Sequence, residues 1–135
     1  MKIRIKITQN PAEASENIIE FETDSEIQYQ PDPKTKEIFR VYTFIEPTYN
    51  VENRIEVNEN KVNIFSGVAT LNLEKNNKTE NTFIKIDKDS NEHSFSLFAQ
   101  LHETKTDDNS SYFSYTIFDG DQNKVIAVKM ELMHI

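Results

Sequence analysis

The sequence contains no cysteine and no tryptophan, and only two glycines and four prolines among its 135 residues. Without cysteine the chain can form neither disulfide bonds nor a thiolate nucleophile. Phosphate-binding loops, dinucleotide-binding turns and nucleophile elbows each need several glycines, so two glycines exclude them. No apolar run approaches the roughly 18 residues that a membrane-spanning helix requires. These absences remove many of the enzyme and membrane classes that short motifs identify.

Basic residues are also scarce. The 15 lysines and arginines are outnumbered by 23 aspartates and glutamates, which gives a formal net charge of −8. Nucleic-acid backbones and anionic membranes select basic surfaces, so we expect neither as a partner. The first residues, Met1–Arg4, alternate between apolar and charged side chains and contain no apolar signal core. We therefore expect a protein of the cytoplasm.

The sequence is rich in β-branched and aromatic residues. Fifteen isoleucines and nine phenylalanines are too many for a disordered chain. Isoleucine, valine, phenylalanine, tyrosine and threonine all favour strands. A chain of this length suits one compact unit with its own core, so residues 1–135 are predicted to form a single domain.

Apolar residues recur with a period of two, which indicates half-buried strands. The clearest segment is Ile18–Gln30, in which the two phases alternate without a break from Ile19 onward; it would span about 43 Å at roughly 3.3 Å per residue. A small domain accommodates such a strand by coiling it, as barrels do. The alternative is a break near Asp24-Ser25 that divides it into two strands.

The segment Glu37–Ile45 is apolar on both faces, so it is predicted to be central or covered on its outer side. The sequence does not determine which of its two faces points into the barrel. Arg40 shares a phase with Tyr42 and Phe44. In the lumen, Arg40 would be a buried cation that needs an anion. On the outside, it would be an ordinary surface arginine with its stem along Tyr42, which is the favoured interpretation.

Further strands are predicted along the rest of the chain. They span Met1–Thr8, Val51–Asn58, Val62–Glu74 (interrupted at Ser66-Gly67), Thr82–Asp87, Ser94–Thr104, Ser111–Phe118 and Lys124–His134. The one helical candidate is a single turn at Asn10–Asn17, with Pro11 at its first position. The prediction is an all-β antiparallel meander of eight to ten strands, closed into a barrel or else folded as a sandwich.

The order of these elements resembles the YwiB-like family of uncharacterised bacterial β-barrels. The resemblance covers nearly the whole chain. It rests on Ile18–Tyr29, Tyr42 with Glu46, Val51–Ile64, Ser66–Val68 and the shape of the last three strands. It implies a calycin-like barrel, akin to the lipocalins. It implies neither an activity nor site residues.

Metal and cofactor sites are not predicted. The only histidines, His93, His102 and His134, have spacings that match no metal motif, so we expect them to be exposed to solvent. Asp87–Asn91 and Asp119–Asn123 begin like calcium loops but lack the glycine that such loops need at their sixth position. Both are predicted to be hairpin turns in which aspartate and asparagine cap their own backbone.

Two functions from different classes remain. A barrel of this size holds one small, partly apolar ligand. The predicted ligand-binding residues are Tyr29, Arg40, Tyr42, Phe95, Phe113 and Tyr115, and further candidates for the lining are Phe21, Ile27 and Leu97. The alternative is a protein–protein interaction module, either a homodimer or a regulatory partner's docking domain, in which side chains fill the lumen. No nucleophile–base pair can be identified, so catalysis is not favoured.

Overall fold

The computed structural model describes residues 1–67 and 69–135, and every regular element within them is a strand. The ten strands are β1 (Lys2–Pro11), β2 (Asn17–Pro31), β3 (Ile38–Glu46), β4 (Val51–Val57), β5 (Lys61–Ser66), β6 (Ala69–Glu74), β7 (Thr79–Ile86), β8 (Glu92–Asp107), β9 (Ser110–Phe118) and β10 (Lys124–His134). The described residues form no helix long and apolar enough to span a membrane.

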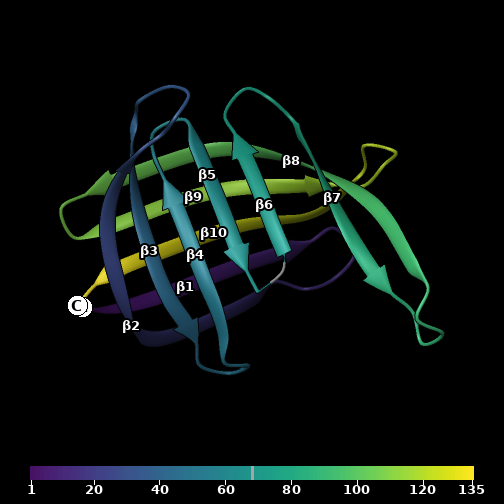
Figure 1. The fold of residues 1–135 in the computed structure, drawn as a ribbon, viewed down its shortest axis with the longest axis horizontal. Coiled ribbons are helices and arrows are strands. Elements are labelled where there is room, and N and C mark those ends of the chain that lie inside the picture. Colours follow the sequence, from purple (N-terminus) through teal and green to yellow (C-terminus); the bar gives the residue numbers. More distant parts are fainter. Residues whose placement is uncertain (68) are drawn as a thin grey trace.

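The strands form one antiparallel sheet in the order β6-β5-β4-β3-β2-β1-β10-β9-β8-β7. Pairing of β1 with β10 joins the first and last strands of the chain. The sheet curls into a nearly closed barrel, and Figure 1 shows β1, β8, β9 and β10 crossing behind β3–β6. The predicted all-β barrel of eight to ten antiparallel strands is therefore confirmed.

Strand β2 makes one corner of this barrel. Its residues 17–24 pair with β1, and its residues 25–31 pair with β3. Ser25, where the partner changes, is buried, and its hydroxyl lies 2.9 Å from the carbonyl of Glu26 and 3.1 Å from that of Thr43. The long alternating segment is thus one continuous strand, and the break considered near Asp24-Ser25 is a change of partner instead.

The opposite corner is closed by a side chain. Strands β6 and β7 meet beside the turn that joins them and then diverge (Figure 1). The side-chain Oδ1 of Asn81 accepts the backbone N–H of Asn72 at 2.8 Å, and its Nδ2 donates to the Asn72 carbonyl at 3.3 Å. The Asn81 side chain thereby takes the place that the backbone of a neighbouring strand would have beside Asn72 of β6. Beyond it, residues 82–97 of β7 and β8 project as a two-stranded hairpin, the β7–β8 arm.

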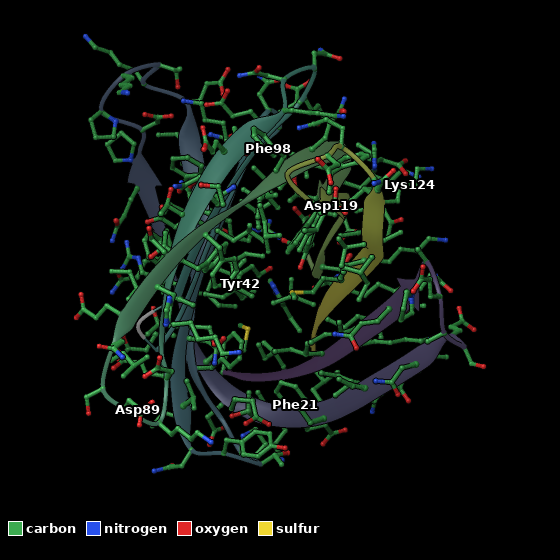
Figure 2. All side chains as sticks on the ribbon, turned by 90° about the vertical axis from the view of Figure 1, so that its right-hand side faces the viewer. Phe21, Tyr42, Asp89, Phe98, Asp119 and Lys124 are labelled. Carbon is green, nitrogen blue, oxygen red and sulfur yellow. The ribbon has the colours of Figure 1, made fainter. Side chains whose placement is uncertain are left out.

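Apolar side chains from the inward phase of most strands fill the middle of the barrel. This core contains Ile3, Ile5, Tyr42, Phe44, Ile55, Val57, Val62, Leu73, Ala99, Leu101, Phe113, Tyr115, Val128, Met130 and Leu132. Figure 2 shows Tyr42 near the centre of the ring of strands, with Phe21 on its lower wall. The inward phase of β3 is therefore Arg40, Tyr42 and Phe44, which answers the question that the sequence left open.

The outward phase of β3 is covered at Phe39 and Val41, as expected for a strand with two apolar faces, whereas Ile45 near its end is 53% exposed. Val41 is only 1% exposed although it points away from the lumen. Its in-register neighbours on this face are Gln28 and Glu56. The Arg54 guanidinium donates to Gln30 at 2.8 Å and to Glu56 at 3.0 Å. Long polar side chains thus form a layer over the outer face of β3.

Some local predictions differ from the structure. The helical turn predicted at Asn10–Asn17 is wrong: β1 continues to Pro11, which pairs with Ile126, because proline is tolerated at the end of a strand. The interruption at Ser66-Gly67 is a full reversal between β5 and β6, with Gly67 at φ 59°. Val68, part of the predicted Val62–Glu74 strand, lies outside the described residues.

The two calcium-like stretches are hairpin turns, as predicted. The Asp87 carboxylate accepts the backbone N–H groups of Asp89 and Asn91 at 2.9 and 3.0 Å. Asp119 repeats the pattern in its own turn, accepting from Asp121 and Asn123, both at 2.9 Å. These two carboxylates therefore stabilise the turns in which they lie by accepting hydrogen bonds from the turn backbone.

Candidate ligand-binding site

One end of the lumen is closed by a polar cluster, which consists of Arg40, Tyr42, Ser111 and His134. The Tyr42 hydroxyl is fully buried and lies 2.7 Å from both Ser111 Oγ and His134 Nε2. The Arg40 Nη1 donates to Ser111 Oγ at 3.2 Å and to the Ser110 carbonyl at 3.0 Å. The cluster joins β3 to β9 and β10 across the barrel, so it fastens opposite walls together.

Arginine can only donate, so Ser111 Oγ accepts from Arg40. The hydroxyls of Ser111 and Tyr42 can each donate or accept, so the proton between them can come from either oxygen. His134 Nε2 accepts from Tyr42 or donates to it according to the tautomer of the imidazole. Burial and the nearby Arg40 charge lower the pKa of His134, while Asp107 acts in the opposite direction. A neutral imidazole at the end of this chain satisfies every member.

Arg40 is thus not the ordinary surface arginine that the sequence favoured. Among the residues described, no carboxylate lies within ion-pair distance of its guanidinium. Its charge is stabilised instead by the Ser111 hydroxyl, by the Ser110 carbonyl and by the ring of Tyr29, whose centroid lies 5.8 Å from the guanidinium carbon. Those tyrosines, Tyr29 and Tyr42, keep the pKa of Arg40 raised although desolvation by burial, the largest single influence, lowers it.

The predicted ligand-binding residues fall in three places. Tyr29, Arg40 and Tyr42 lie at the closed end, and Tyr29 is largely exposed. Phe113 and Tyr115 are core residues whose rings stack with centroids 6.1 Å apart. Phe95 lies on the β7–β8 arm, where it stacks on Phe83 at 5.6 Å. The fold therefore brings Tyr29, Arg40 and Tyr42 together and separates them from Phe95.

The histidines are dispersed, and within the described residues no group of three metal-ligating side chains forms. His93 pairs with Asp87 at 2.9 Å near the tip of the arm, and His102 bonds Thr116 at 2.7 Å. His134, which was expected to be exposed to solvent, is instead half-buried in β10 and bonded to Tyr42. Its burial follows from the pairing of β10 with β1, which places it opposite Ile3.

A pocket of about 470 Å³ opens at another part of the lumen's rim. We call it the rim pocket; its lining is Ile7, Ile19, Phe21, Glu46, Thr48, Tyr49, Val51, Asn53 and Ser66. Its floor belongs to β1 and β2, where Ile7 pairs with Ile19 and continues the inward phase of the buried Ile5. Its roof is the turn from β3 to β4. The volume falls within the range of small-molecule pockets, roughly 300–1,000 Å³.

Polar groups are few in the rim pocket and lie on one wall. Asn53 and Ser66 are cross-strand partners on the inward phase of β4 and β5. Glu46 ends β3, and its two carboxylate oxygens accept the backbone N–H groups of Thr48 at 2.9 Å and Tyr49 at 2.7 Å. These bonds lower the pKa of Glu46, chiefly the one from Tyr49, so its carboxylate is ionised at neutral pH.

A larger depression of about 670 Å³ lies on the outer surface over β4–β6. Its charged and amide side chains are largely engaged with one another. Lys61 bonds Asp32 at 3.4 Å, and Asn77 bonds Glu74 at 2.9 Å. Because a ligand there would compete with existing pairs, the rim pocket is the better candidate site.

Comparisons with known proteins identify no relative. No family model matches the chain, and neither the curated proteins nor the solved structures include a match. The site must therefore be interpreted from its own geometry.

Sequence reasoning found one residue of the rim pocket, Phe21, and missed the others. Ile7 and Ile19 were assigned to an apolar face, but nothing local shows that this face lies near the rim. Glu46, Thr48 and Tyr49 follow a predicted strand end, a position typical of any loop. The one available signal was Tyr49, a large aromatic residue in the turn that begins with Pro47.

Proposed function

We propose that the protein binds a small, partly apolar molecule in the rim pocket. The observation that carries this proposal is the pocket itself: a concave volume of about 470 Å³ whose floor is apolar and whose polar groups lie on one wall. A preformed apolar recess with a few convergent polar groups is the usual form of a ligand site. The buried middle of the barrel provides the rigid support for it.

The rim pocket differs from the site first predicted. The side chains of Tyr42, Phe113 and Tyr115 belong to the packed core, so a ligand would have to displace them to reach the centre of the lumen. Overpacking a filled core costs about 1–3 kcal/mol or more. Occupation of the rim requires no such displacement, because its apolar residues are only partly buried.

A fluorescent reporter tests the proposal. N-phenyl-1-naphthylamine, a neutral apolar dye, is expected to gain fluorescence on binding to the wild-type protein. Val51→Trp should fill the pocket and abolish the gain. Val125→Trp is the matched control, since Val125 is exposed at the start of β10 and does not line the pocket. Equal dye binding by both variants, or none by the wild type, would refute the proposal.

A second candidate function is self-association through β7, in which a second copy of the chain covers the arm. Ile84 and Ile86 are 66% and 65% exposed on a strand that borders only β8 beyond Asn81. Antiparallel pairing of two β7 edges about a two-fold axis would bury both residues in each copy. Light scattering after size-exclusion chromatography should then give a dimer, and Ile84→Lys a monomer. A monomeric wild type would exclude this candidate.

Kinship with the YwiB-like calycins is likewise a proposal. The antiparallel barrel agrees with what that resemblance implies, and the acidic, cysteine-free composition supports the cytoplasm as its compartment.

A further inference from the structure

We propose that the ligand of the rim pocket carries an organic ammonium group, so that the protein binds amphiphilic or aromatic amines in preference to neutral or acidic analogues. This inference rests on the proposed function and adds the charge of the ligand to it. Three features of the pocket support it: a single ionised carboxylate, two aromatic rings, and an apolar floor.

Among the described residues, Glu46 is the only charged one that lines the rim pocket. Two backbone N–H groups hold its carboxylate in place at the pocket's edge, at 2.7 and 2.9 Å. A carboxylate oxygen has more than one acceptor position, so each oxygen can still accept a bond from a ligand. No lysine or arginine within residues 1–67 and 69–135 lines the pocket, so a ligand cation would meet the carboxylate without a competing basic side chain of this part of the chain.

Phe21 and Tyr49 line the same pocket as Glu46. The face of an aromatic ring attracts a cation, and the attraction grows when the cation is partly removed from water. Tyr49 is 82% exposed, so its ring lies open to solvent at the edge of the pocket. A carboxylate that shares its pocket with two aromatic rings complements an ammonium group that carries an apolar substituent.

The rest of the pocket determines where the apolar part of the ligand would lie. Ile7, Ile19 and Val51 supply an apolar surface that continues from the barrel core. An acidic amphiphile would meet the same surface but would place its carboxylate near Glu46, on a protein whose net charge is −8. Like charges at close range oppose binding. The pocket therefore discriminates by the charge of the polar end.

A titration with three chain-matched probes tests the inference. Octylammonium, 1-octanol and octanoate share one alkyl chain and differ in the polar end. Each would be added below its aggregation limit, at pH 7 and low salt, while backbone amide NMR shifts are followed. We expect octylammonium to bind about tenfold more tightly than 1-octanol, the range of one ion pair plus one cation–π contact, and octanoate to bind most weakly.

Two variants and one control assign the preference to its residues. Glu46→Gln should equalise octylammonium and 1-octanol. Glu52→Gln makes the same charge change at an exposed residue in β4 outside the pocket and should keep the preference. Glu46→Gln removes one acceptor from the turn and can weaken it, so Tyr49→Leu provides an independent test at an exposed position. It should lower the affinity for octylammonium more than the affinity for 1-octanol.

The outcomes separate this inference from the proposed function. Equal affinities of the wild type for all three probes would overturn the ammonium preference and leave the rim pocket as an apolar site. Tighter binding of octanoate would also overturn the preference and would direct attention to Arg40. The absence of shifts at the rim pocket with every probe would refute both the pocket and the preference.

Discussion

The buried hydroxyl of Tyr42 offers the most direct test of the fold. Tyr42→Phe removes one oxygen and keeps the ring, so packing should be nearly unchanged. The change breaks two hydrogen bonds of 2.7 Å, to Ser111 and His134. Ser111 Oγ keeps the bond from Arg40 at 3.2 Å, and the half-buried His134 can recruit water.

The expected loss of stability follows from these contacts. A buried hydrogen bond contributes about 0.5–1.5 kcal/mol net, and more when its removal leaves a partner unsatisfied. Two bonds, with both partners partly compensated, give a loss of about 2 kcal/mol in the free energy of unfolding. For a domain of this size each kcal/mol lowers Tm by roughly 3–5 °C. Urea denaturation would measure the first quantity and calorimetry the second.

Tyr115→Phe is the matched control. Tyr115 lies in the same core, but its hydroxyl has no hydrogen-bond partner among the residues that the structure describes. The same chemical change should therefore leave stability within about 0.5 kcal/mol of the wild type. If Tyr42→Phe lowered the free energy of unfolding no more than Tyr115→Phe, the polar cluster would not stabilise the barrel in the way that its geometry indicates.

Three further predictions concern single side chains. The folded state lowers the pKa of His134, so the unfolded chain takes up the proton at a higher pH, and the free energy of unfolding should fall as the pH drops below about 6.5. In urea denaturation, the stabilities of the wild type and His134→Gln should differ at pH 7 and converge at lower pH. Burial raises the pKa of Tyr115 to about 12. Its contribution to the free energy of unfolding should therefore be complete below pH 10 and decline by about 3 kcal/mol as the pH rises towards 12, a decline that Tyr115→Phe should not show. Asn81→Ala removes the bonds to the backbone of Asn72 and should speed amide exchange at Asn72 in NMR, with a loss of about 1–2 kcal/mol; unchanged exchange at Asn72 would show that Asn81 does not close the barrel.

The strands were predictable because alternation is a local property. Within Ile18–Gln30 the phases alternate without a break from Ile19 onward, and the structure contains one strand there, β2. The change of partner within it was not predictable, since the residues on either side of Ser25 have the same pattern. Which strand lies alongside each half depends on how the whole sheet coils. At Pro11 a local rule predicted the start of a helical turn. Pairing with Ile126 of β10 makes this residue the end of strand β1 instead.

The polar cluster shows why site residues are harder to predict than strands. Tyr42 was a candidate because it is aromatic and lies on a two-faced strand. Its partners are 69 and 92 residues away in the sequence. Ser111 is indistinguishable in sequence from other strand serines, and His134 is near the end of the chain. Only the registers of β9 and β10 bring these two residues to Tyr42.

The two-faced apolar pattern of β3 also bears on where a protein partner would bind. From the sequence, Glu37–Ile45 was predicted to be central or covered on its outer side. In the structure the chain itself covers Val41, because Arg54, Gln30 and Glu56 hold one another over that face. A partner at this face would have to break an existing ion pair before reaching apolar surface. Ile38 and Ile45 remain exposed at the two ends of β3, but Ile84 and Ile86 lie close together on β7, which is an edge strand of the sheet. If the protein associates with itself, the geometry therefore favours the arm, and substitutions at Val41 should affect folding while those at Ile84 affect association.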